Sequence, residues 1–318
     1  MTRTLTYQIK SDAQTVKEFL SAQGFSRQTI IALKKQPESI LVGGIWVHVN
    51  HILHCGDMLT ITLSEPLSSE KIVPVSLPLD IVYEDEDILV VNKPADMPIH
   101  PSLNNYDNTL ANAVAYYYLS QNTPFIFRCI NRLDRDTTGL TVIAKNQLSA
   151  GILSEQMARR EIKREYIAIV AGIGLPESGI IDAPIARVNG STIERHVDFT
   201  MGERAVTHYQ VKKTYPSKHL TLVRLWLETG RTHQIRVHMK YLGYPLLGDF
   251  LYNPPSKILP SADDAATDDR PSIETSSKNQ KISRQALHAQ KLTFIHPLTK
   301  EPLTFEAPIP EDMHSLLL

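Results

Sequence analysis

The chain has 318 residues, of which 42% are hydrophobic, with a formal net charge of −1 and a pI near 6.9. This length and apolar content suit two folded domains and exclude a largely disordered protein. Cys55 and Cys129 are too few for a disulfide framework or a four-cysteine zinc site. No apolar run approaches the roughly 18 residues of a membrane span, and the polar start MTRTLTYQIKSD lacks the apolar centre of a signal peptide, so we expect a soluble cytoplasmic protein.

The first 66 residues predict a small module of two helices followed by strands. A helix over residues 11 to 22 would begin at Ser11 or Asp12, and a second helix would begin at Ser26. Alternating apolar residues in GIWVHVN and DMLTITL predict two strands. The second helix would carry an exposed basic edge formed by Arg27, Lys34 and Lys35. Residues 67 to 79, rich in proline and serine, predict a linker.

Residues 80 to 318 predict a larger α+β domain. Strands are expected in IVY, ILVV, FIFRCI and TGLTVIAK, with a helix over 110 to 117 capped near Asn108. EYIAIVAGI is apolar on both faces and predicts a central strand, while THYQVKKTYP, HLTLVRLWLET and ALHAQKLTFIHP predict further strands. A helix is expected over 233 to 242. Residues 254 to 281 show no apolar period and predict a mobile surface insertion.

The stretch NRLDRDTTGL places Asp134 between Arg132 and Arg135 in a polar loop between two predicted strands. An opposite charge within about 4 to 6 Å favours the ionised form of a carboxylate, which can then act as a nucleophile or a base. The alternative is a loop salt bridge in which Asp136 and the threonines cap the turn. On spacing alone the two interpretations are evenly matched.

GRTHQIRVHMK predicts an amphipathic helix, with His233, Arg236 and Lys240 on its polar side. If Thr232 caps this helix, its N-terminus and Arg231 would face an anion, either Asp134 or a phosphate. The alternative is a solvated basic face without a ligand. Tyr166, on the central strand, is by itself more typical of a packed aromatic than of a catalytic one.

Other patterns carry little functional weight. His48, His51, His54 and Cys55 do not follow a recognised zinc-ligand spacing, so we expect ordinary surface residues there. GIGLPESG lacks the GK[ST] ending and the GxGxxG spacing of nucleotide loops, and there is no GxSxG elbow. The near-neutral pI does not by itself indicate a nucleic-acid-binding protein. However, residues 195 to 240 hold nine lysines and arginines against three acids, a local balance of +6.

Five segments in order resemble the motifs of the RluA-type RNA pseudouridine synthases. They are YEDEDILVVNKPADMPIHPS, RLDRDTTGLTVIAK, KREYIAIVAG, TGRTHQIRVHMKYLGYPLLGDFLY and ALHAQKLTFIHPLTKEPLTFEAPIP, and together they cover about residues 80 to 313. The N-terminal residues resemble an S4-type RNA-binding module. The resemblance implies a catalytic domain built on a mixed, largely antiparallel central sheet, in an α+β fold.

The family isomerises uridine within RNA to pseudouridine and needs neither cofactor nor metal. The resemblance implies that Asp134 is the essential carboxylate, Arg231 its ion-pair partner and Tyr166 the aromatic that packs against the target base. It implies that Arg132 fills the gap left by the flipped nucleotide. Base flipping costs a few kcal/mol, which gives an inserting cation and a stacking aromatic a physical purpose. Many members have histidine where this chain has Asn131, whose small polar side chain can still form hydrogen bonds.

We therefore expect a monomeric enzyme that binds structured RNA, with large-subunit ribosomal RNA favoured and transfer RNA second. The predicted RNA-binding residues are Arg132, Arg135, Arg27, Lys34, Lys35, His233, Arg236 and Lys240. The RNA would lie across a cleft lined by residues 132 to 135, 160 to 164 and 231 to 240. Two alternatives remain at this point: a nucleic-acid glycosylase that releases free base, and a non-catalytic RNA-binding assembly protein.

Overall fold

A computed structural model describes residues 2–65, 67–103, 105–254 and 282–318. The predicted insertion therefore lies, apart from Pro254, outside the described residues. Among the described residues, no helix combines the length and apolar character needed to cross a bilayer.

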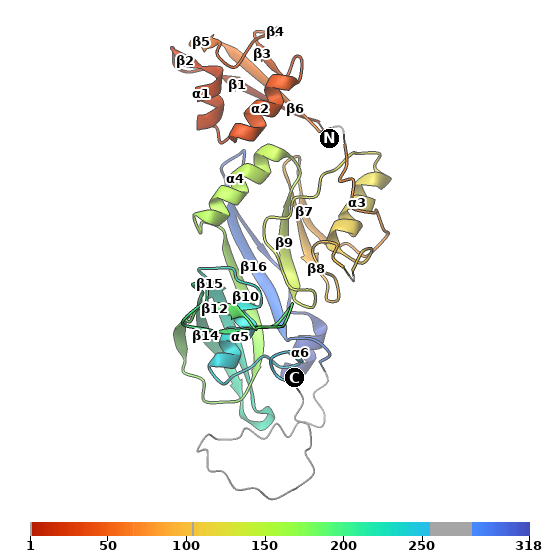
Figure 1. The fold of residues 1–318 in the computed structure, drawn as a ribbon, viewed down its shortest axis with the longest axis vertical. Helices are drawn as coiled ribbons and strands as arrows, with labels where there is room; N and C mark the ends of the chain where they lie inside the picture. The colour runs from red at the N-terminus through yellow and green to blue at the C-terminus, as the bar shows by residue number, and fades with distance from the viewer. Residues whose placement is uncertain (1, 66, 104, 255–281) are drawn as a thin grey trace, which may run out of the picture.

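The N-terminal residues form a separate module, drawn in red at one end of the molecule in Figure 1. Its helices are α1 (Val16–Ala22) and α2 (Arg27–Lys35), and its sheet has the order β1-β6-β3-β4. Its strands are β1 (Thr2–Gln8), β2 (Gln14–Thr15), β3 (Ile40–Val42), β4 (Ile45–Trp46), β5 (Ile52–Leu53) and β6 (Met58–Ser64).

Both predicted helices of this module are confirmed, but their details differ. Ser26 caps α2 as expected, accepting a hydrogen bond from the backbone N–H of Thr29, whereas α1 is capped by Thr15 rather than by Ser11 or Asp12. The predicted strand in GIWVHVN shrinks to two residues, because the chain leaves the sheet after Trp46. Strand β1 was not predicted, since its polar outward residues hide the alternation. Strand β6 ends at Ser64, beside the expected boundary near residue 66.

The module is packed onto the second domain rather than joined to it by the chain alone. Leu148 and Ile152 of α4 (Gln147–Ala158) belong to the same buried apolar cluster as the module's own core. On β1, the Arg3 guanidinium donates to both carboxylate oxygens of Asp87, at 3.2 and 3.1 Å. Beyond β6, Arg128 pairs with Glu65 at 2.8 Å. Apolar burial and the ion pairs of Arg3 and Arg128 therefore fix the position of the module.

The larger domain is built on one sheet with the order β11-β14-β15-β10-β16-β9-β8-β7, and β17 also pairs with β16. The contact of β16 with β9 is parallel and the other pairings of this sheet are antiparallel, so the predicted mixed, largely antiparallel α+β fold is confirmed. Its strands are β7 (Ile81–Glu84), β8 (Ile88–Lys93), β9 (Thr138–Ala144), β10 (Lys163–Ala171), β11 (Ser178–Asp182), β14 (Val206–Tyr215), β15 (Leu220–Leu227), β16 (Leu287–Ile295) and β17 (Pro302–Glu306). A 3-10 turn, Pro216–Lys218, joins β14 to β15.

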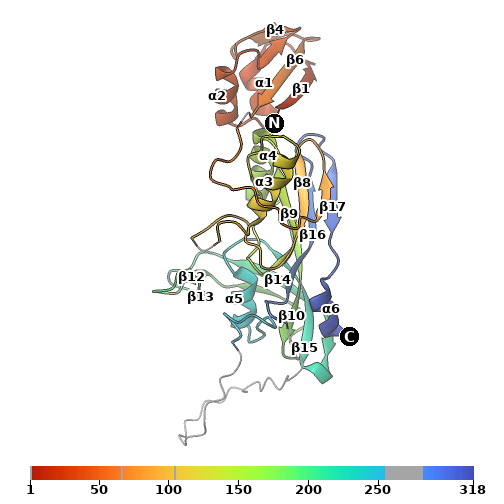
Figure 2. The same ribbon diagram turned by 90° about the vertical axis from the view of Figure 1, so that its right-hand side faces the viewer.

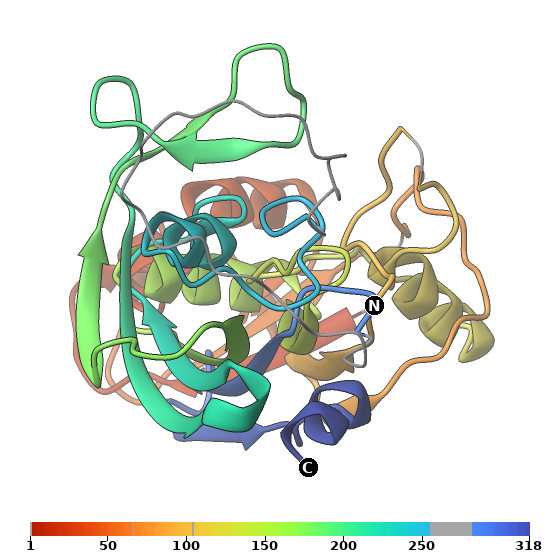
Figure 3. The same ribbon diagram turned by 90° about the horizontal axis from the view of Figure 1, so that it is seen from below.

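Helices cover both faces of this sheet, as the two side views show (Figures 1 and 2). Helices α3 (Leu110–Ser120), α4 and α5 (Gln234–Tyr241) lie on one face and α6 (Glu311–Leu317) on the other. Strand β10 is central as predicted: its Ala168 and Val170 pack in the cluster that holds α5, and its Ile167 and Ile169 in the cluster that holds α6. A two-stranded hairpin, β12 (Ile185–Arg187) and β13 (Arg195–Val197), extends over α5 (Figure 3).

Candidate active site

Asp134 lies in the loop that leads into β9. The predicted strand over 125 to 130 is wrong: the segment runs beside β9 with a single isolated bridge, between Cys129 and Ile143. The buried amide of Asn131 continues the pairing instead. It donates to the carbonyl of Leu140 at 3.0 Å and accepts from the N–H of Val142 at 2.9 Å. A side chain that replaces ladder hydrogen bonds frees the following backbone to turn away from the sheet and present Asp134.

Two buried basic side chains hold the backbone of this loop. The Nζ atom of Lys93 donates to the carbonyl of Arg135 at 2.8 Å, and Nη1 of Arg284 donates to the carbonyl of Asp136 at 3.3 Å. Burial lowers the pKa of Lys93 to about 7, although Asp136 and Asp134 act in the opposite direction. The loop is therefore anchored through its backbone, which leaves the Asp134 side chain directed toward the cavity.

Arg236 is the ion-pair partner of Asp134. Its Nη1 lies 3.2 Å from Oδ2 of Asp134, while its Nε and Nη2 donate to the two oxygens of Asp249 at 2.7 and 2.8 Å. Burial by itself lowers the pKa of Arg236, but the hydrogen bonds and charge of Asp249 and then of Asp134 outweigh it, so the pKa is raised. Asp134 keeps 26% of its side chain exposed, against 1% for Asp249. The outer carboxylate is thus the one a substrate can reach.

The predicted pairing of Asp134 with Arg231 is wrong. Arg231 forms its ion pair with Glu203 and donates from Nε to the carbonyl of Arg204 at 3.1 Å. The prediction failed because it placed a cap at Thr232. The helix begins one residue later than that cap requires, at Gln234, and His233 occupies the cap position with φ of +58° and no side-chain cap. The guanidinium that points at Asp134 therefore comes from the first turn of α5 instead of the preceding loop.

The two arginines beside Asp134 in the sequence do not pair with it in the described structure. Arg135 bonds Asp96 instead, with 2.7 Å between Nε and Oδ1, and lies 3.6 Å from Asp136. Arg132 is exposed and lines the cavity next to Asp134. Successive side chains of an extended loop point in different directions, so closeness in sequence did not give contact in space.

Tyr166 lines the cavity and is 4% exposed. Burial raises the pKa of its hydroxyl, so the tyrosine is neutral near pH 7. The neighbouring Arg164 also lines the cavity, and its Nε is buried without a hydrogen-bond partner among the described residues. A buried donor that lacks a partner is costly, so a bound acceptor at this position would be stabilised.

The cavity that these residues share has a volume of about 530 Å³. Such a volume lies in the range of small-molecule sites and is large enough to admit one extruded nucleotide. All three predicted segments contribute to the lining, and both Asp134 and Arg231 belong to it. Its charged residues are Arg132, Asp134, Arg160, Arg164, Glu228, Arg231 and Arg236, so cations outnumber acids.

The remaining predicted RNA-binding residues divide by exposure. Arg27, Lys34 and Lys35 are exposed on α2, and Lys240 is exposed on α5. Arg236, predicted on the same polar face, is instead 7% exposed and engaged by two carboxylates. Its amphipathic pattern was misleading because a buried ion pair looks like a surface charge in sequence. His233 is partly buried, with Nε2 3.9 Å from Oδ2 of Asp134.

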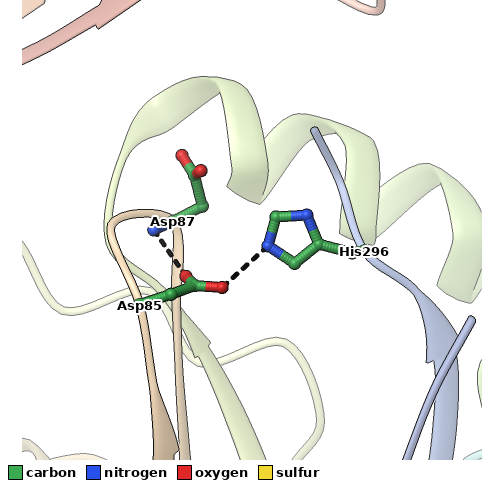
Figure 4. Close-up of side chains that lie close together, drawn as sticks. All are labelled: Asp85, Asp87 and His296. Carbon is green, nitrogen blue, oxygen red and sulfur yellow. Dashed lines mark hydrogen bonds and ion pairs between the residues drawn. The ribbon is translucent and has the colours of Figure 1, made fainter. Parts of the chain in front are cut away.

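A second group of titratable residues lies away from this cavity (Figure 4). Potential ligand atoms of Asp85, Asp87 and His296 lie within 4.8 Å of one another. However, Nδ1 of His296 accepts two backbone N–H groups, so Nε2 carries the hydrogen and donates to Asp85 at 3.0 Å. Asp87 receives Arg3 of the module. Because these atoms already have partners, the group acts as a polar junction beside the N-terminal module.

The larger domain has the fold of RNA pseudouridine synthases. The human protein RNA Pseudouridylate Synthase Domain Containing 1 is similar in structure, with a TM-score of 0.57 and 25% sequence identity over 76% of this chain and 89% of that chain. Human RNA Pseudouridylate Synthase Domain Containing 4 is similar with a TM-score of 0.56 and 25% identity, over 75% of this chain and 91% of that one. The class of protein is thus an enzyme that isomerises uridines in RNA.

Sequence comparison makes the assignment specific. A family model described as RNA pseudouridylate synthase matches residues 87–241. The Uncharacterized RNA pseudouridine synthase YjbO of Bacillus subtilis is 39% identical over 95% of this chain and 98% of that protein. Ribosomal large subunit pseudouridine synthase D of Vibrio cholerae is 41% identical over 83% of this chain and 77% of that protein. The chain belongs to the RluA-type RNA pseudouridine synthase family, so it is an isomerase rather than a glycosylase or a binding protein.

Sequence reasoning missed two residues that complete the site. Asp249 and Tyr252 lie in GDFLY, a segment that was recognised as a family motif without a role for either residue. Asp249 clamps Arg236, and the Tyr252 ring lies 5.0 Å from the Arg236 guanidinium carbon. Asp249 and Arg236 lie 13 positions apart in the sequence. No periodic pattern in the sequence indicates that two residues separated by a helix and a turn will pair.

Proposed function

We propose that this enzyme converts uridines of large-subunit ribosomal RNA to pseudouridine, with Asp134 as the essential carboxylate. The substrate proposal draws on the relative named ribosomal large subunit pseudouridine synthase D, which shares 41% identity with this chain. Transfer RNA is the second candidate. The contact that carries the site proposal is the one between Asp134 and Arg236, because it places a charged, half-buried carboxylate at the wall of a cavity large enough for one nucleotide.

In this proposal the target uridine leaves its stack and enters the cavity. Tyr166 packs against the base, and Arg132 fills the space that the base vacates. As the C–N glycosidic bond breaks, positive charge develops on the ribose, and Asp134 either attacks or shields it, as carboxylates do in glycoside chemistry. The base turns, its carbon C5 bonds to the ribose, and C5 loses its proton while N1 gains one. Arg236 holds the Asp134 carboxylate in position throughout.

The N-terminal module extends the RNA contact in this proposal. Arg27, Lys34 and Lys35 on α2 are exposed cations that suit phosphate binding, as in an S4-like module. Arg3 and α4 hold the module against the domain that contains the cavity. A fixed spacing would select RNAs whose backbone reaches both surfaces.

The direct test is pseudouridine mapping of total RNA from cells with and without the gene. The proposal expects one or more large-subunit ribosomal RNA sites to vanish and to return with the wild-type gene but not with Asp134→Asn. Loss of sites confined to transfer RNA would contradict the substrate proposal. Return of the sites with Asp134→Asn would contradict the site proposal.

A further inference from the structure

His233 has an uncommon backbone conformation beside the proposed catalytic carboxylate. It occupies the left-handed region, with φ of +58° at the start of α5, where few side chains other than those of asparagine, aspartate and histidine are found. Its Nδ1 lies 2.8 Å from the hydroxyl of Tyr252, and its Nε2 faces Oδ2 of Asp134 at 3.9 Å. This conformation places the imidazole between a buried tyrosine and the cavity.

The hydrogen bonds define which nitrogen of His233 carries its hydrogen. The Tyr252 oxygen accepts the backbone N–H of Arg195 at 3.0 Å. Burial raises the pKa of Tyr252 to about 12, although the Arg195 contact opposes this, so the hydroxyl keeps its proton and can donate it to Nδ1. Burial also lowers the pKa of His233, which outweighs the attraction of Asp134, so the ring is neutral near pH 7. A neutral ring that accepts at Nδ1 carries its hydrogen on Nε2.

We propose that Tyr252 and His233 form a positioning chain that orients Asp134 for the reaction. In this chain the Arg195 N–H bonds Tyr252, the Tyr252 hydroxyl bonds His233, and the Nε2–H of His233 points at the carboxylate. The 3.9 Å separation is longer than a hydrogen bond, and such contacts commonly tighten when substrate binds. The proposal rests on Asp134 being the reacting carboxylate and assigns functions to two further residues.

Tyr252 serves both partners of Asp134 in this arrangement. Its ring lies 5.0 Å from the Arg236 guanidinium carbon, and its backbone N–H donates to Asp249 at 3.3 Å. One tyrosine therefore supports Arg236 through its ring and His233 through its hydroxyl. Because Arg195 belongs to β13, the chain also ties the orientation of Asp134 to the β12–β13 hairpin, which extends over α5 (Figure 3).

The test is a double-mutant cycle of Tyr252→Phe and His233→Asn. Phenylalanine keeps the ring beside Arg236 and removes only the hydroxyl, and asparagine tolerates the left-handed backbone but is too short for the chain. In single turnover at saturating RNA, Tyr252→Phe should lower the rate about tenfold, as expected for one lost hydrogen bond, with RNA affinity within about twofold of wild type. The double variant should be no slower than His233→Asn alone, because both substitutions break the same chain.

Tyr117→Phe provides a matched control. It removes a hydroxyl that donates to Glu84 at 2.7 Å, outside the residues that line the cavity, and it should leave the rate unchanged. The positioning chain is overturned if Tyr252→Phe keeps the wild-type rate while Asp134→Asn is inactive, if only RNA affinity changes, or if the two substitutions act additively. Wild-type activity of Asp134→Asn would instead overturn the proposed function, on which the positioning chain rests.

Discussion

Removing the Arg236 guanidinium should affect stability and catalysis for different reasons, which a second substitution can separate. Arg236 is 9% exposed in its side chain and Asp249 is 1% exposed. Arg236→Met leaves the Asp249 carboxylate buried without a counter-charge, a change that typically costs about 3–5 kcal/mol. Combining it with Asp249→Asn removes that charge as well, while the amide oxygen can still accept the backbone N–H groups of Leu251 and Tyr252.

We therefore expect the double variant to recover most of the free energy of unfolding that the single variant loses. The pseudouridine-forming rate should stay low in both, because a hydrogen bond between charged groups contributes about 1.5–3 kcal/mol, which corresponds to a rate loss of about 10- to 150-fold. Urea denaturation measures the stability. Release of tritium from RNA labelled at uridine C5 measures the single-turnover rate. If the double variant recovered its rate together with its stability, Asp134 would not need the guanidinium and the reasoning would fail.

Three further outcomes follow from the structure. Arg231→Ala should leave the single-turnover rate within about threefold of wild type, because Arg231 pairs with Glu203. A loss of rate as large as that of Arg236→Met would instead support the pairing of Arg231 with Asp134 that the sequence predicted. Burial lowers the pKa of His288 to about 4, so the folded state resists protonation of this ring, and the stability that His288 contributes should be fully present above about pH 7 and fall as the pH drops below 6.5. Between pH 7 and 4, the free energy of unfolding of wild type should fall by about 3 kcal/mol more than that of His288→Gln. Urea denaturation measures both, and an equal dependence on pH in the two proteins would contradict this. In the module, Gly24→Ala would place Cβ 2.9 Å from Cγ1 of Ile152, whereas Gly44→Ala shares the positive φ but meets nothing within 4 Å. Gly24→Ala should therefore destabilise the protein by about 1–3 kcal/mol more than Gly44→Ala. Equal free energies of unfolding for the two variants would mean that α4 does not support the module.

The sequence predicted the strongly periodic parts of the fold well. Strand β10 was recognised as central because both of its faces are apolar, and α2 because Ser26 and its apolar spacing agree. The segment over 125 to 130 failed for the opposite reason: its apolar residues pack into the cluster around α3 without forming a ladder. Helix α6 was missed because its seven residues follow a proline-rich stretch that predicts a loop.

The site was predicted in its residue types more than in its contacts. The motif around Asp134 led to the cavity, and Tyr166 and Arg231 are among the residues that line it. The identity of the ion-pair partner depended on whether α5 is capped at Thr232 or at His233, and this difference moves the guanidinium that faces Asp134 from residue 231 to residue 236. Asp249 and Tyr252 could not be assigned because their roles exist only once the turn after α5 brings them back to it.

The central claim is that the charged oxygen atoms of one side chain, at the wall of a cavity that takes a single nucleotide, are required for the isomerisation. Its most direct measurement is pseudouridine formation by Asp134→Asn in a single turnover, alongside its affinity for the same RNA. The substitution keeps the shape of the side chain and leaves the Arg236–Asp249 pair in place. We predict that RNA binds with an affinity within about threefold of wild type and that no pseudouridine forms, since the neutral amide lacks the charge that nucleophilic or electrostatic catalysis needs. Pseudouridine formation at the wild-type rate would contradict the account.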